Sequence, residues 1–299
     1  MSVEENRIKE SAALIVAAMA IIGVIDNYVR FIAEDAGLWQ FHAVRSVMVL
    51  VLVFGGGLVL GWRWRVVRPW AVLFRSSLVA TSILLYFGAL AVLPIATAGA
   101  GLFSSPIFVL LISVLVLRAP VGPWRIAAVL IGFCGMLLVL RPGGAGFEPV
   151  ALIAILAGAF YASGTLATRR LCAQEEPHVL TAAFFAMVGL FGVIGLVVLG
   201  ATDGPDFFRT GWQPITPRFL QLTALQAIGS LVAVACLVRA YQIADPSFTT
   251  IFEYTFLIFA GLWAWRVFGE LPDAPALIGI ALIVVAGVVI LVRSRKPEP

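Results

Sequence analysis

Leu93 to Arg141 reads LPIATAGAGLFSSPIFVLLISVLVLRAPVGPWRIAAVLIGFCGMLLVLR, and Asp245 to Arg293, 152 positions later, reads DPSFTTIFEYTFLIFAGLWAWRVFGELPDAPALIGIALIVVAGVVILVR. The two stretches align without a gap. Shared apolar residues would mean little here, but three prolines coincide, each at a predicted helix boundary, where proline is tolerated. These pairs are Pro94 with Pro246, Pro120 with Pro272 and Pro123 with Pro275. The sequence therefore predicts an internal duplication.

The composition predicts a membrane protein. Of the 299 residues, 62% are hydrophobic and only 12% are charged, and the mean hydropathy is +1.05. Such a chain is too apolar for a normal wetted surface, so we expect lipid to solvate it. A bilayer core needs roughly 20 apolar residues per helix, which leaves room for about ten spans and no soluble domain.

Ten spans are predicted from the apolar runs between charged residues, glycines and prolines. They lie near residues 12–32, 38–60, 70–92, 95–117, 124–141, 148–168, 179–201, 217–240, 246–268 and 274–293. We expect a tail over 1–11, a five-helix repeat over 12–141, a second over 148–293 and a tail over 294–299. An odd number of helices makes the second repeat enter the membrane from the opposite side, so the fold expected is all-α with inverted repeats.

The basic residues predict the orientation of the chain. If both termini are cytoplasmic, twelve arginines and lysines lie in inside segments and five arginines lie in outside segments. The inside set is Arg7, Lys9, Arg63, Arg65, Arg68, Arg118, Arg125, Arg169, Arg170, Arg293, Arg295 and Lys296. The outside set is Arg30, Arg141, Arg209, Arg218 and Arg266. This bias favours cytoplasmic termini in a bacterial inner membrane, and it explains the net charge of +4 without a nucleic-acid partner.

Motifs in both halves resemble one transporter family. The first half contains Tyr86-Phe-Gly-Ala-Leu-Ala-Val-Leu-Pro-Ile-Ala-Thr-Ala, Pro106, Pro120-Val-Gly-Pro-Trp-Arg and Gly132-Phe-Cys-Gly-Met-Leu-Leu-Val-Leu-Arg-Pro-Gly. The second half contains Arg239-Ala-Tyr-Gln, Phe252-Glu-Tyr-Thr and Phe268-Gly-Glu-Leu-Pro-Asp. Together they resemble the EamA family of the drug/metabolite transporter superfamily. In one departure, Arg118-Ala119 stands where the first half of the family often has glutamate, while Glu270 remains in the second half.

The resemblance implies a ten-helix secondary carrier built from inverted repeats. Members of the family carry amino acids, nucleosides, S-adenosylmethionine, riboflavin, metallophores, choline and other metabolites, so the resemblance leaves the substrate open. Asp26, Arg45, Arg75 and Arg169-Arg170 occupy positions where the family often has such residues.

Three charged residues within the predicted spans are candidates for the substrate site, since a charge at bilayer depth costs about 2.5 to 3.5 kcal/mol on insertion scales. Glu253 could bind a cationic or amino group or titrate as a proton-coupling acid, or it could pair with an arginine or Gln226. Arg45 could receive a carboxylate or phosphate, or pair with Asp26. Asp26 could itself face the substrate, or neutralise Arg30 four residues later.

Histidine and tyrosine side chains complete the predicted substrate site. His42 lies three residues before Arg45 on the same helix face, as a site residue or a hydrogen-bonded wall residue. Four tyrosines at depth offer rings and hydroxyls to a flat or cationic ligand, or simply pack; they are Tyr28, Tyr86, Tyr161 and Tyr254. We expect Arg75 and Arg239 to extend towards lipid headgroups.

These patterns predict a secondary active transporter of an amino-acid-like, zwitterionic or nucleoside- or vitamin-like solute, working by alternating access in the plasma membrane. Its partners would be a small-molecule substrate, the lipid bilayer and a coupling proton or ion. No metal or cofactor is expected, and the sequence does not predict the oligomeric state. The alternatives are a channel, a scaffold or a membrane-embedded enzyme acting on a lipid-linked substrate. The enzyme is disfavoured because the catalytic strings sought are absent and the sequence has only two histidines.

Overall fold

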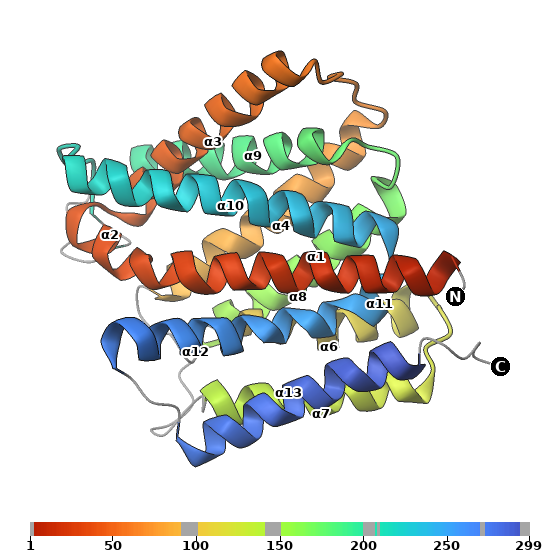
Figure 1. The fold of residues 1–299 in the computed structure, drawn as a ribbon. Coiled ribbons are helices and arrows are strands. Elements are labelled where there is room, and N and C mark those ends of the chain that lie inside the picture. The colour runs from red at the N-terminus through yellow and green to blue at the C-terminus, as the bar shows by residue number, and fades with distance from the viewer. Residues whose placement is uncertain are drawn as a thin grey trace.

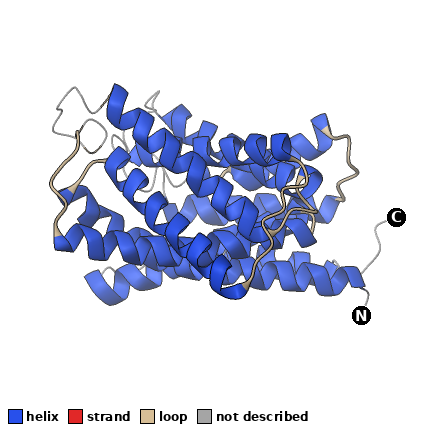
Figure 2. Ribbon diagram, turned by 90° about the horizontal axis from the view of Figure 1, so that it is seen from above, coloured by secondary structure: helices blue, strands red, loops and turns tan. Residues whose placement is uncertain are grey.

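The computed structural model describes residues 3–90, 101–140, 151–199, 207, 210–269 and 273–293. Within these ranges every regular element is a helix, as Figures 1 and 2 show. The start of α1 and the end of α13 lie at the same end of the bundle, here called the terminal end (Figure 1). The opposite end, where α2 ends and α10 begins, is called the far end.

The first half of the chain contains long helices with two irregular turns. Its elements are α1 (Val3–Ile25), the 3-10 turn η1 (Asp26–Tyr28), α2 (Val29–Asp35), α3 (Leu38–Leu60), α4 (Pro69–Leu90), α6 (Ser105–Leu111), the π turn η2 (Ile112–Val116) and α7 (Pro123–Leu140). The first span is therefore longer than expected, since residues predicted as a polar tail are helical from Val3. It is also interrupted at Asp26, where η1 begins.

The second half repeats this pattern of long and interrupted helices. Its elements are α8 (Ala151–Leu171), α9 (Pro177–Val198), α10 (Pro217–Ile243), α11 (Pro246–Thr249), the 3-10 turn η4 (Thr250–Tyr254), α12 (Thr255–Phe268) and α13 (Ala274–Arg293). The expected single helix over 246–268 is thus broken by η4. Hydropathy could not predict this break, because an apolar segment has the same hydropathy whether it forms an α-helix or a 3-10 helix.

Six helical segments are long and apolar enough to cross a membrane. They are Asn6–Asp35, Leu38–Leu60, Pro69–Ala89, Leu152–Leu171, Pro177–Val198 and Pro217–Ile243. Three further apolar helices are shorter: Ser105–Val116, Pro123–Leu138 and Ala274–Ile290. Parts of the predicted spans 70–92, 95–117, 124–141, 148–168 and 179–201 lie outside the described residues.

The main helix pairs join the first half of the chain to the second. α1 packs on α10, α3 on α9, α4 on α8 and α7 on α13. Glycines permit the closest approaches: a Cβ on Gly135 of α7 would lie 2.7 Å from the Gly279 carbonyl oxygen of α13. Small residues at such crossings let helix backbones meet where no hydrophobic effect drives helices together.

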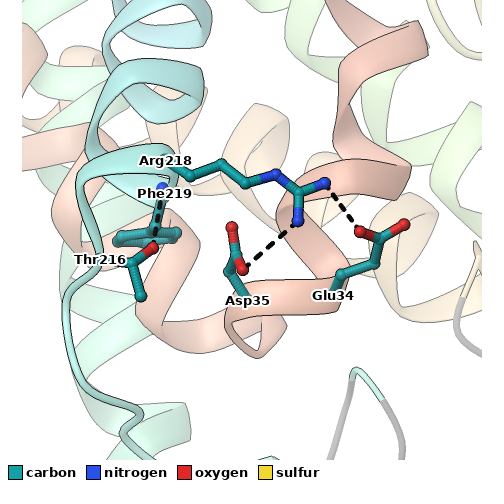
Figure 3. A network of polar contacts seen from close by, with 5 residues as sticks. All are labelled: Glu34, Asp35, Thr216, Arg218 and Phe219. Atoms are coloured by element: carbon teal, nitrogen blue, oxygen red, sulfur yellow. Dashed lines mark hydrogen bonds and ion pairs between the residues drawn. The ribbon is translucent and has the colours of Figure 1, made fainter.

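Polar contacts at the far end tie α2 to α10 (Figure 3). Arg218 Nη2 lies 2.7 Å from Glu34 Oε2, and Nη1 lies 3.6 Å from Asp35 Oδ1. The Thr216 hydroxyl caps α10 by accepting from the Phe219 N–H at 3.1 Å. Because about half of the Arg218 and Glu34 side chains is exposed, we expect these ion pairs to contribute little stability.

Gly101 provides a test of the close packing. A Cβ at this position would lie 2.3 Å from the Ala154 main-chain carbon, whereas a Cβ on Gly56 would meet no atom within 4 Å. Gly101→Ala should therefore lower the stability by about 1 to 3 kcal/mol through overpacking. The control, Gly56→Ala, should be neutral or slightly stabilising, because alanine favours helix. Thermal unfolding in detergent measures both, and equal melting temperatures for the two variants would refute this packing.

Candidate substrate cavity

A central cavity lies between the two halves of the chain. Residues of both halves line it, and it is partly open to the outside. Most of the wall is aliphatic or aromatic, and two groups of polar side chains come from distant parts of the sequence. We name them the Arg45 pole, made of Asp26, His42, Arg45 and Gln226, and the Glu253 pole, made of Ser105, Tyr161, Tyr241 and Glu253. The first lies nearer the far end and the second nearer the terminal end.

Arg45 is held in place by its own helix and by aromatic rings. Its Nη2 donates to His42 Nδ1 at 3.1 Å. Its guanidinium carbon lies 4.9 Å from the ring centre of Phe41, 5.9 Å from that of Phe87 and 5.8 Å from that of Phe185. The sequence predicted the shared face of His42 and Arg45, and this prediction is confirmed. His42 lies behind Arg45 and does not itself line the cavity.

Asp26, in η1, and Gln226, in α10, line the cavity together with Arg45. The Gln226 amide donates to the Ile25 carbonyl at 2.6 Å and to Asp26 Oδ1 at 3.5 Å. Asp26 and Arg45 attract each other electrostatically, yet no ion pair within 4.0 Å joins these two described residues. The structure therefore does not show the alternative of a direct Asp26–Arg45 ion pair. Both side chains line the cavity. The Arg30 side chain lies outside the described residues.

Glu253 is surrounded by hydroxyl groups. The Tyr241 hydroxyl donates to Oε1, and the Ser105 hydroxyl donates to Oε2 at 3.0 Å. Tyr161 lines the same part of the cavity. Only 2% of Glu253 is exposed. Among the described residues no arginine forms an ion pair with it, and Gln226 bonds to Asp26 instead. The structure therefore does not show the alternative in which Glu253 pairs with an arginine or with Gln226.

Arg75 was expected to extend towards headgroups, and this prediction was wrong. The side chain is buried and lines the cavity. Its Nε donates to the Thr168 hydroxyl at 2.9 Å, and its Nη1 donates to the Leu180 carbonyl at 3.3 Å. The position of Arg75 near a helix end does not show whether its side chain extends to the headgroups or bonds inside the protein. Its partners lie on other helices, α8 and α9, which the local sequence does not reveal. Arg239, by contrast, is exposed near the terminal end.

The four predicted tyrosines are divided between the cavity and the packing around it. Tyr86 and Tyr161 line the cavity. Tyr28 lies outside it, with its ring centre 6.2 Å from that of Phe31 and 6.5 Å from that of Trp263. Tyr254 packs on α7, where a Cβ on Gly132 would lie 2.8 Å from its ring.

Sequence reasoning missed Tyr241 and Ser105 as partners of Glu253. Tyr241 precedes Glu253 by twelve residues, and the turn between α10 and α11 brings the two together. The Arg239-Ala-Tyr-Gln motif was a signal for Tyr241, but a residue at a predicted helix end was not expected to reach a buried acid. Ser105 comes from the other half of the chain, so only the tertiary fold could place it.

Comparison with known proteins identifies the family. The model of the EamA-like transporter family matches residues 10–141 and again residues 149–293, which together make up most of the chain.

Relatives match along nearly the whole chain. A riboflavin transporter of Rhizobium johnstonii is 29% identical over 308 residues, covering 99% of this chain and 97% of the relative. An S-adenosylmethionine uptake transporter of Rickettsia bellii is 25% identical over 269 residues, covering 89% and 86%. Both relatives are named as transporters, not as enzymes.

A solved crystal structure has the same fold. It superposes with a TM-score of 0.79 at 20% identity and covers 97% of this chain and 99% of its own chain. With two matches to one family model and long apolar helices throughout, the chain belongs to the EamA-like transporter family of multi-pass membrane proteins.

Proposed function

We propose that this protein is a secondary active transporter of a small, flat, neutral heteroaromatic metabolite, with riboflavin as the first candidate. The observation that carries this proposal is the central cavity, whose wall combines aromatic rings with two separate polar groups. The riboflavin transporter of Rhizobium johnstonii, similar over nearly its full length, supports the same substrate class.

The mechanism we propose is alternating access between two inverted five-helix repeats. The pairing of helices supports it, because exchanging the halves leaves the pairing unchanged. When each helix is replaced by its counterpart in the other half, the α1–α10 pair becomes the α8–α4 pair. The α3–α9 and α7–α13 pairs each join two counterparts, so they stay the same. In a scaffold with this symmetry, the two halves can exchange conformations about a pseudo-twofold axis in the membrane plane, which opens the cavity to opposite sides. Ten spans also agree with α1 beginning and α13 ending at one end of the bundle.

Glu253 is the proposed proton-coupling group. Its carboxyl accepts from hydroxyl groups and forms no ion pair with a described residue. A buried carboxyl of this kind can take up a proton when the cavity opens to water and release it on the other side. The acid would then link the movement of a neutral substrate to the proton gradient.

Riboflavin exchange tests the substrate. Liposomes that contain the purified protein and unlabelled riboflavin should take up labelled riboflavin without ATP. Arg45→Lys should slow this exchange about ten-fold or more, since lysine lacks the planar fork held by the rings. The control, Arg239→Lys, alters an exposed residue and should exchange normally. Uptake of S-adenosylmethionine in place of riboflavin would contradict the proposed substrate class.

Glu253→Gln tests proton coupling. This isosteric change should leave riboflavin exchange within a few-fold of the original rate and abolish the extra accumulation produced by an imposed pH gradient, because the amide cannot carry a proton. Glu34→Gln, at an exposed carboxylate of the far end, should keep both activities. Gradient-driven accumulation by Glu253→Gln at the normal level would refute the role of the acid.

Cysteine labelling tests the orientation. In a variant that lacks Cys134, Cys172 and Cys236, a cysteine would replace either Arg65 at the terminal end or Ile215 at the far end, both exposed. An impermeant maleimide should label Ile215→Cys in intact bacteria and Arg65→Cys only after permeabilisation, because basic residues mark the cytoplasmic side. The reverse labelling pattern would contradict this orientation, because it would place both termini on the side of the inner membrane opposite the cytoplasm.

A further inference from the structure

The Arg45 pole contains polar atoms that the described protein leaves without partners. Arg45 Nε and Gln226 Oε1 are buried and have no hydrogen bond, although both side chains line the cavity. Buried polar groups in native proteins are nearly always satisfied, and exceptions call for an explanation. Two unsatisfied atoms that belong to the lining of one cavity suggest that a ligand supplies their partners.

The two atoms require complementary partners. Arg45 Nε can only donate a hydrogen bond, whereas Gln226 Oε1 can only accept one. The orientation of the Gln226 amide is fixed by the Ile25 carbonyl, which accepts from Nε2 at 2.6 Å and would repel Oε1 in the flipped amide. A ligand that satisfies both atoms must therefore present an acceptor beside a donor.

Charge narrows the class of ligand further. A simple anion could pair with Arg45, but it would leave Gln226 Oε1 unsatisfied and would approach the Asp26 carboxylate. A simple cation could approach Asp26, but Arg45 would repel it. A neutral edge in which a carbonyl lies next to an N–H satisfies the donor and the acceptor without adding charge to a site where Asp26 and Arg45 already offset each other.

We propose that the Arg45 pole is a recognition subsite for the cyclic amide or imide edge of a flat ring system. The ring carbonyl accepts from Arg45, and the adjacent ring N–H donates to Gln226 Oε1. Phe87 and Phe185, which flank the guanidinium and line the cavity, form an apolar wall beside the ring. The inference rests on the proposed function, from which it takes the position of the substrate in this cavity.

The experiment compares riboflavin, whose ring has such an edge, with 3-methylriboflavin, in which a methyl group replaces the imide hydrogen. Each competes with labelled riboflavin in the liposome exchange assay. We expect 3-methylriboflavin to compete at least ten-fold more weakly, because the methyl group leaves Gln226 Oε1 unpaired. An analogue with one extra methyl group on the benzenoid ring controls for size and should compete within a few-fold of riboflavin.

Gln226→Met tests whether Gln226 accepts the hydrogen bond from the ring N–H of the ligand. Methionine keeps the length of the side chain but has no strong acceptor, so riboflavin should compete more weakly and N-methylation should add no further penalty. The matched control, Gln221→Met, changes an exposed glutamine of the same helix and should retain the full discrimination. Because Gln226 also bonds to Ile25, a melting curve checks the fold of the variant, while the analogue comparison in the unmodified protein stands by itself.

The outcomes separate the subsite from the proposed function. Equal competition by riboflavin and 3-methylriboflavin in the unmodified protein would overturn the subsite and leave riboflavin transport intact. Competition by an α-amino acid at the same strength would also overturn it, since a zwitterion could bridge Arg45 and Asp26. A complete lack of riboflavin exchange would overturn the proposed substrate, and the subsite with it.

Discussion

A charged or polar group inside a bilayer must find its partners in the protein or in a ligand, because hydrocarbon supplies none. This constraint explains the position of each buried charge in the structure. Arg75 donates to Thr168 and to the Leu180 carbonyl, and Glu253 accepts from Tyr241 and Ser105. Arg45 differs, since His42 satisfies only part of its guanidinium. In the proposal above, the substrate supplies the partner that Arg45 Nε lacks.

The duplicated scaffold and the chemistry of the cavity come from different residues. At the repeat offset of 152, Gly101 corresponds to Glu253. A side chain at Gly101 would collide with Ala154, so the first half has no room for an acid there. Phe87, which lines the cavity, corresponds to Arg239, which is exposed. The symmetry of the helix pairs thus supports a rocking motion, while the differences between the halves give the cavity its two unlike poles.

Sequence patterns predicted an all-helical membrane protein and several cavity residues, because hydropathy and helical spacing report local constraints. The contact of Arg45 with His42 and Phe41 follows from positions on one helix, and it was predictable. Tyr28 and Tyr254 were misplaced because an aromatic residue at depth can face the cavity or pack against another helix. The partners of Arg75 and Glu253 lie on other helices, and the 3-10 turn that presents Glu253 has no hydropathy signal, so neither was predictable.

In the proposed mechanism, one ligand occupies the cavity between the two polar groups. The most direct measurement is an experimental structure of the protein with riboflavin bound. It should show ligand density between Phe87 and Phe185, with the ring edge at Arg45 and Gln226 and the remainder of the molecule directed towards Glu253. Riboflavin bound outside this cavity, or a cavity filled only by water and lipid at saturating riboflavin, would contradict the account.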